Sequence, residues 1–275
     1  MNTEIPDIPR KGRGAISNRT GRFECRNIVA IDDGWNPQPD DDMPPLRTTV
    51  TADATRTIIA RNTSPDVPFD RSINPYRGCE HGCVYCFARP THAFLGLSPG
   101  LDFESRLFYK PEAVALLEKE LQKKSYACNV MAMGTNTDPY QPIEREHKIT
   151  RRILKVLAAH NHPVSIVTKA SLIARDIDIL GPMAKKKLAQ VSLSVTTLNR
   201  DLSRKMEPRA PTPQRRLDTI RTLVEAGIPC SVMAAPMIPV LTDPELESIL
   251  DAAKDAGACM AGYLMLRLPM EIKDL

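Results

Sequence analysis

The run Ser72-Ile-Asn-Pro-Tyr-Arg-Gly-Cys-Glu-His-Gly-Cys-Val-Tyr-Cys-Phe-Ala-Arg89 carries three cysteines, Cys79, Cys83 and Cys86, in one short loop. Their C-x3-C-x2-C spacing lets three thiolates surround one bound object. Iron–sulfur clusters are held by cysteine thiolates, and a cubane cluster has four irons. Three cysteines therefore leave one iron free to bind another ligand.

The neighbours of these cysteines support the same interpretation. Gly78 and Gly82 precede the first two cysteines, and glycine lets a backbone approach a bulky object closely. Tyr85 stands just before the last cysteine, where an aromatic ring would cover a ligand on the open iron. The loop predicts a cluster with a ligand-binding corner.

Zinc is the alternative occupant of this loop. It takes four ligands, and either His81 or His92 would be the fourth. A disulfide is less favoured, because no apolar leader precedes the run and we expect a reducing, cytoplasmic setting. The loop alone leaves iron–sulfur and zinc open and favours the former.

Composition sets only broad limits on function. The chain has 275 residues, of which 42% are hydrophobic and 25% are charged, enough for one large α/β domain or two small ones. No apolar run reaches the roughly 18 residues that a membrane span needs, so we expect no membrane partner. The net charge of +4 is compatible with a nucleic-acid partner without indicating one.

Residues 1–68 are predicted to be an irregular N-terminal segment. Lys11-Gly-Arg-Gly14 is a flexible basic stretch, and Trp35–Pro45 is rich in proline and aspartate. We interpret the segment as a solvated tail. The alternative is a segment that wraps the domain or contacts substrate.

Residues 69–275 alternate β-branched runs with helical stretches, which is typical of βα units on a parallel sheet. Six β units fit a partial (β/α)6 barrel, a doubly wound sheet or part of an eightfold barrel. Glu271–Leu275 reads as the start of a sixth helix, so we expect the C-terminus to be truncated and the last strand to have an open edge. The expected strands are 69–77, 129–134, 164–168, 190–196, 229–235 and 262–267, and the expected helices are 111–123, 148–159, 172–187, 213–226 and 244–256.

Functional residues in parallel α/β folds gather at the carboxyl ends of strands. The second strand ends in the polar, turn-rich loop Gly134–Glu144. Alternation in the fourth strand places Ser194 and Thr196 on one face. Arg267 ends the sixth strand and would pair with a carboxylate.

Three further charged residues follow strands. Lys169 ends the third strand, where it would meet an anionic group or point to solvent. Glu207 and Arg209 lie beyond the fourth strand, and we expect them to form an ion pair or to contact substrate.

The cysteine loop resembles that of the radical S-adenosylmethionine (SAM) superfamily, whose pattern is C-x3-C-x-aromatic-C. The resemblance implies that Cys79, Cys83 and Cys86 ligate a [4Fe–4S] cluster, with SAM chelated on the open iron. It also implies the partial (β/α)6 barrel, release of a 5′-deoxyadenosyl radical that abstracts hydrogen, and an external one-electron donor of the flavodoxin or ferredoxin type.

The resemblance assigns expected cofactor contacts as well. In the superfamily, the position after the second strand binds the methionyl amino group, and we expect Asp138 to supply the charge there. Hydroxyls near the fourth strand would bind ribose, and Tyr85 would cover the ligand. The expected cofactor-binding residues are Tyr85, Gly134, Thr135, Asn136, Asp138, Ser194, Thr196 and Arg267.

Within the superfamily, Asn74–His92 together with Gly134–Pro142 resemble a bacterial subfamily without an assigned function, related to the DNA-repair enzyme spore photoproduct lyase. That lyase has a hydrogen-donating cysteine where Thr135 and its neighbours stand here, so its reaction is not carried over. The expected function is a radical SAM enzyme with an unknown substrate, nucleic acid being one candidate. The alternative is a zinc-stabilised nucleic-acid-binding module without catalysis.

Overall fold

A computed structural model describes residues 3–4, 7–24, 31–32, 46–65 and 67–274 of the chain. Cys25 and the stretch Trp35–Pro45 lie outside these residues. In the described part, no helix combines the length and the apolar character that crossing a bilayer requires.

The main sheet has seven strands in the order β12-β11-β10-β9-β8-β5-β4, all parallel except the edge strand β4. Within the described residues β12 does not pair with β4, so the sheet is an open, partial barrel. The predicted fold class is confirmed. The bounds are β4 Ile59–Arg61, β5 Arg71–Ile73, β8 Met131–Met133, β9 Val164–Thr168, β10 Ala189–Ser194, β11 Cys230–Met237 and β12 Met260–Met265.

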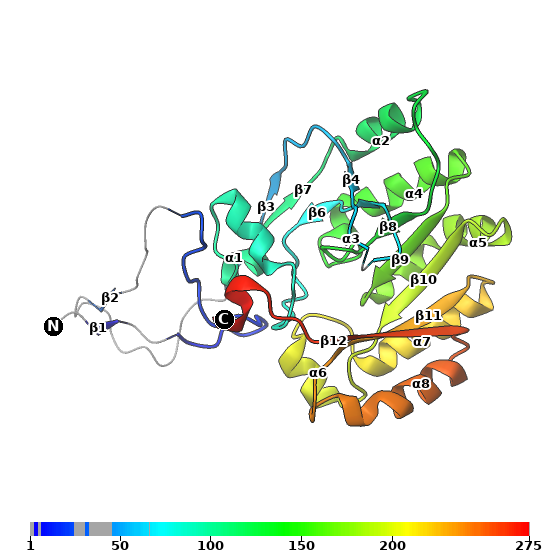
Figure 1. Ribbon diagram of the computed structural model, residues 1–275. Coiled ribbons are helices and arrows are strands. Elements are labelled where there is room, and N and C mark those ends of the chain that lie inside the picture. Colours follow the sequence, from blue (N-terminus) through cyan, green and yellow to red (C-terminus); the bar gives the residue numbers. More distant parts are fainter. Residues whose placement is uncertain (1–2, 5–6, 25–30, 33–45, 66, 275) are drawn as a thin grey trace.

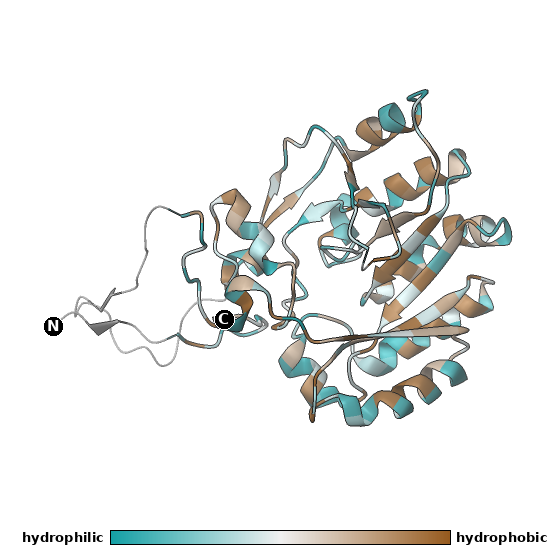
Figure 2. Ribbon diagram, viewed as in Figure 1, coloured by the Kyte–Doolittle hydropathy of each residue, from teal (hydrophilic) through white to brown (hydrophobic). Residues whose placement is uncertain are grey.

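Five helices alternate with these strands and lie on the outer side of the curved sheet (Figure 1). In α4, for example, Ile149, Ile153 and Leu157 recur at helical spacing and are fully buried against the sheet. Apolar residues accordingly concentrate on the strands and on the inner helix faces (Figure 2). The bounds are α2 Ala113–Leu121, α4 Ile149–Ala159, α5 Ile177–Lys185, α7 Pro213–Glu225 and α8 Leu246–Asp255.

Short elements fill the connections. The α-helices among them are α1 Leu101–Ser105, α3 Glu144–His147 and α6 Arg200–Met206. The 3-10 helices are η1 Arg89–Leu95, η2 Ser171–Asp176, η3 Asp243–Glu245 and η4 Met270–Asp274. The expected sixth α-helix is therefore wrong in kind, because a 3-10 helix occupies that stretch.

Residues before 69 are less irregular than expected. β3 (Thr49–Ala52) pairs in parallel with β7 (Arg106–Tyr109), which pairs antiparallel with β6 (Tyr76–Arg77). β4 joins the main sheet, and β1 (Thr3–Glu4) pairs with β2 (Ile31–Asp32). The boundary between residues 68 and 69 stays a prediction.

The solvated-tail interpretation is wrong for the basic stretch near the N-terminus. Arg13, Ala15 and Ser17 are each less than a tenth exposed. The Arg13 guanidinium donates to Glu104 O at 2.6 Å and to Leu46 O at 2.7 Å. Two carbonyls thus hold this arginine against the domain, and the wrapping alternative describes the segment better.

The C-terminal 3-10 helix η4 lies against the part of the N-terminal segment that contains Arg22. Arg22 lies 3.8 Å from the Glu271 carboxylate, and η4 lies beside the N-terminal segment (Figure 1). Edge strand β12 has a mostly exposed surface, including Tyr263 and Met265. The predicted open edge of the last strand is present.

Gly134 ends β8 in the left-handed region, with φ of 84°, and a Cβ there would lie 1.9 Å from Val167 O in β9. Gly227 has a similar φ of 77° with open space around it. We predict that Gly227→Ala costs about 1 kcal/mol of unfolding free energy, from backbone strain alone. Gly134→Ala adds a clash with a core strand and should cost at least about 3 kcal/mol. Urea unfolding of both variants measures this difference, and equal costs would contradict the packing argument.

Candidate functional site

The cysteine loop follows β6 of the three-stranded sheet and lies at the carboxyl edge of the main sheet, where His81 faces Asp138 beyond β8. Cys79 and Cys83 are buried and Cys86 is half-buried. Burial, the Asp138 carboxylate and the two other sulfurs raise the pKa of Cys79. Burial also raises the pKa of Cys83 to about 12, with Lys169 acting in the opposite direction. The thiols of Cys79 and Cys83 therefore stay protonated until a metal displaces their protons.

The arrangement does not favour a zinc site. Among the described residues, no three His, Cys, Asp or Glu side chains converge to hold a single ion. His81 Nδ1 faces the Asp138 carboxylate at 3.4 Å, and His92 Nε2 is 2.9 Å from Arg106 O. A cubane cluster makes a different demand, because each thiolate binds its own iron and the sulfurs surround the cluster. Three shielded thiols in one loop fit that group.

Gln141 holds the backbone on both sides of Cys79. Its Oε1 accepts the Glu80 N–H at 2.9 Å, and its Nε2 donates to Gly78 O at 3.0 Å. The Gln141 side chain is fully buried. Cys79 N–H itself donates to Phe103 O at 2.9 Å. The first cysteine is therefore fixed in position by its neighbours before any metal binds.

Arg89 and Glu104 form a buried ion pair beneath the second cysteine. Arg89 donates twice to Cys83 O, at 3.0 and 2.9 Å, through Nε and one terminal nitrogen. The Glu104 carboxylate accepts the N–H groups of Gly14 and Ala15 at 2.9 and 2.8 Å. One ion pair thus connects the cysteine loop to the N-terminal segment.

That connection brings two backbones into contact. A Cβ on Gly14 would lie 1.8 Å from Gly82 O, so only glycine fits there. The stretch Lys11-Gly-Arg-Gly-Ala15 consequently packs against the cysteine loop. Its second glycine, Gly14, is required because any side chain there would clash with the loop backbone.

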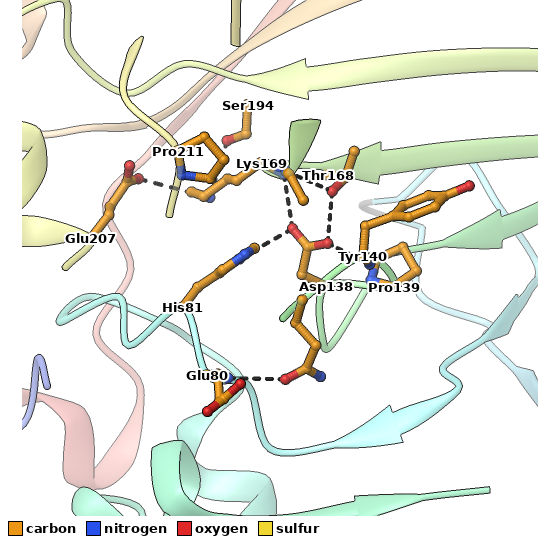
Figure 3. A network of polar contacts seen from close by, with 12 residues as sticks. Glu80, His81, Asp138, Pro139, Tyr140, Thr168, Lys169, Ser194, Glu207 and Pro211 are labelled. Carbon is orange, nitrogen blue, oxygen red and sulfur yellow. Dashed lines mark hydrogen bonds and ion pairs between the residues drawn. The ribbon is translucent and has the colours of Figure 1, made fainter. Parts of the chain in front are cut away.

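Asp138, which stays a predicted cofactor contact, has protein partners at both carboxylate oxygens. Its Oδ1 accepts from Thr168 Oγ1 at 2.7 Å and from Tyr140 N at 2.8 Å. Its Oδ2 accepts from Lys169 N at 2.8 Å and faces His81 Nδ1 (Figure 3). Burial opposes the charge of Asp138, but His81 and these hydrogen bonds lower its pKa to about 2. Each oxygen thus has two partners within the protein.

A buried polar cluster centred on Glu207 lies below Tyr85. Burial opposes the charge of Glu207, yet Arg216 and Lys169 lower its pKa to about 2. Glu207 also accepts from Tyr85 and, at 2.8 Å, from Thr196 Oγ1. Lys169 Nζ lies 3.9 Å from Glu207 and donates to Ser194 Oγ at 3.1 Å (Figure 3). The cluster consists of Tyr85, Lys169, Ser194, Thr196, Glu207 and Arg216.

The structure brings Tyr85, Ser194 and Thr196 together, as their strand-end positions suggested. Arg267 is exposed beyond β12. The expected ion pair between Glu207 and Arg209 is wrong: Glu207 pairs with Arg216, and Arg209 pairs with Glu80 at 3.1 Å.

The loop after β8 is tied to the strand that precedes the cysteines. Asn74 Oδ1 accepts the N–H of Asn136 at 3.1 Å, and its Nδ2 donates to Thr135 Oγ1 at 3.3 Å. Asn74 lies in the cysteine-containing stretch Ser72–Arg89, but no periodic pattern in the sequence indicates that its side chain holds the loop after β8. Sequence reasoning also missed the roles of Arg89, Glu104, Gln141 and Arg216.

We predict that Gln141→Ala destabilises the protein by about 3 kcal/mol, because Gly78 O and Glu80 N–H lose their buried partner. The iron bound per chain after anaerobic reconstitution should fall as well. The control is Gln190→Ala, an exposed glutamine that donates to Ser165 Oγ at 3.0 Å and should change stability by less than about 0.5 kcal/mol. Unchanged iron content in a destabilised Gln141→Ala protein would show that the clamp does not serve the loop.

Sequence comparison identifies related chains. A model of the radical SAM superfamily matches residues 73–253. An uncharacterized protein of Mycobacterium tuberculosis is 41% identical over 194 residues, covering 70% of this chain and 57% of the relative. An uncharacterized protein of Methanocaldococcus jannaschii is 32% identical over 174 residues, covering 63% and 62%. The chain thus spans less than two thirds of the length of these relatives.

Solved structures share the fold at low identity. A spore photoproduct lyase mutant superposes with a TM-score of 0.60 at 15% identity, covering 82% of this chain and 64% of that chain. Another, solved with bound AdoMet and dinucleoside spore photoproduct, gives a TM-score of 0.59 at 15% identity and the same coverage. SuiB of Streptococcus suis, bound to its precursor peptide SuiA, gives 0.52 at 15% identity over 81% of this chain and 40% of that chain. Likenesses at this level concern the fold alone.

Proposed function

The chain belongs to the radical SAM superfamily, and on that premise we propose that it is an enzyme that cleaves SAM reductively to begin radical chemistry on a substrate. The observation that supports this most is the cysteine loop, held at the carboxyl edge of the parallel sheet by Gln141, Arg89 and Phe103 O. When bound, a [4Fe–4S] cluster and SAM supply a 5′-deoxyadenosyl radical that abstracts hydrogen.

Cys79, Cys83 and Cys86 would hold the cluster. Their backbone is fixed independently of it, so binding does not have to order the loop. The Lys169 ammonium places a positive charge near Cys83, where it would face the thiolate of a loaded cluster. Burial opposes the charge of Lys169, but Cys83 and Glu207 raise its pKa above the usual value. Lysine at this position stays protonated and stabilises negative charge on the loop.

Neighbouring residues would position SAM. Tyr85, which directly precedes Cys86, is anchored by Glu207, and Ser194 Oγ accepts a hydrogen bond from Lys169 that leaves one of its two acceptor positions. We assign Ser194 to a ribose hydroxyl and Thr196 to the support of Tyr85. The half-buried loop Gly134–Asn136, tied to Asn74, would receive the methionyl group. Asp138 is a positioning residue in this proposal, and Arg267 stays a prediction.

An external one-electron donor of the flavodoxin or ferredoxin type would reach the cluster through the outer side of the loop. Val84 is 38% exposed and Phe87 is 58% exposed on either side of half-buried Cys86, which supports this route. The described cysteines are free thiols, in keeping with the reducing cytoplasmic setting expected for such a cluster. The substrate stays open, with nucleic acid as one candidate class.

Anaerobic reconstitution with iron and sulfide tests the proposal. We expect the reconstituted protein to be brown and to convert SAM to 5′-deoxyadenosine when dithionite is added. The 5′-deoxyadenosine is measured by chromatography. Cys79→Ala, Cys83→Ala and Cys86→Ala should each abolish the product and reduce bound iron. Cys128→Ala, which removes an exposed cysteine beside β8, should leave both unchanged.

Two results would contradict the proposal. A folded wild-type protein that binds zinc and takes up no iron would favour the non-catalytic module. Product formation that survives all three substitutions would show that another site is responsible.

A further inference from the structure

A surface pocket of about 620 Å³ opens beside the cysteine loop. Its walls come from four parts of the chain: the N-terminal basic stretch, the residues that precede β3, the cysteine loop, and the turn after α6. Glu80, the residue next to Cys79, contributes from the cysteine loop itself. The lining residues are Lys11, Gly12, Arg13, Leu46, Arg47, Thr48, Glu80 and Arg209.

Positive charge dominates this lining. Among the residues that the structure describes, it contains four cationic side chains and one carboxylate, and that carboxylate is already engaged by Arg209 at 3.1 Å and by Thr48 Oγ1. The hydrogen bonds of Arg13 go to two carbonyls and, at 3.0 Å, to Thr48 Oγ1, none of which carries a charge. Lys11 and Arg47 are exposed at the rim.

The cations are held together by the fold. Arg13 is buried, and Arg209 N–H donates to His81 O at 3.2 Å, which fixes that wall to the cysteine loop. Burial first, and then the nearby Arg209, lower the pKa of Arg13, whereas Glu104 and Glu80 act in the opposite direction. A bound anion would relieve the repulsion between Arg13 and Arg209 and would not need to order the site first.

We propose that this pocket binds a phosphate group, as a phosphomonoester or phosphodiester of the substrate. Several guanidinium groups around one pocket match phosphate, which offers more acceptor oxygens than a carboxylate and up to two charges. The assignment to a substrate rests on the proposed function, whereas the binding of phosphate does not. Because Glu80 adjoins Cys79, a phosphate held here would anchor its molecule next to the radical source.

Binding to the cluster-loaded protein tests the pocket without measuring turnover. The probes are a fluorescein-labelled single-stranded DNA 12-mer, followed by anisotropy, and inorganic phosphate, followed by calorimetry. Lys11→Glu with Arg47→Glu should weaken binding at least about tenfold and reduce the salt-dependence slope by about 2. The neutral pair Lys11→Ala with Arg47→Ala should weaken binding in the same direction to a smaller extent.

Arg215→Glu with Lys155→Glu is the matched control, because it reverses two exposed charges on α7 and α4. It should bind as the wild type does. Iron content and circular dichroism confirm that each variant is folded. A 12-mer with a neutral methylphosphonate backbone should lose binding.

The two probes distinguish the sources of the phosphate. Much tighter binding of the 12-mer than of inorganic phosphate supports a polynucleotide, and binding of inorganic phosphate alone supports a small phosphate ester. The proposal is overturned if the wild type binds neither probe, or if the pocket pair and the control pair bind equally. If the wild-type protein binds phosphate but forms no 5′-deoxyadenosine, the proposed function is overturned and the phosphate site is not.

Discussion

The buried ion pair between Arg89 and Glu104 is the interaction on which the rest of the site depends. A buried charged pair is stable only when its remaining hydrogen-bonding groups are also satisfied. Here the satisfying groups are Cys83 O on one side and the N–H groups of Gly14 and Ala15 on the other. The requirement to satisfy two buried charges therefore joins the cysteine loop to the N-terminal segment.

The loop after β8 performs the corresponding task from the opposite side. Gln141 clamps the backbone around Cys79, and Asp138 ties His81 to the end of β9. The polar atoms of both side chains form hydrogen bonds within the protein. The less buried residues of the loop, and Ser194 Oγ in β10, which accepts from Lys169, retain polar groups that a ligand could use under the proposed function.

Much of the fold could be predicted because it is periodic. The strand expected at 164–168 is found at Val164–Thr168, and the helix expected at 213–226 ends one residue earlier, at Glu225. The side chains that hold the cysteine loop could not be predicted. Arg89, Gln141 and Glu104 contact backbone groups that are distant in the sequence, so they produce no repeating pattern. The prediction of a solvated N-terminal tail was wrong for the same reason. The segment lacks periodicity, yet Arg13 donates to carbonyls that are distant in the sequence.

The close approach of Gly14 to Gly82 sets how the cysteine loop can move. The contact is backbone against backbone, so no side-chain rotation can widen it. Any outward swing of the loop requires the N-terminal segment to lift first. The outward movement of the cysteine loop is therefore limited by how firmly a few N-terminal residues stay in place, although these residues contribute no cysteine to the site.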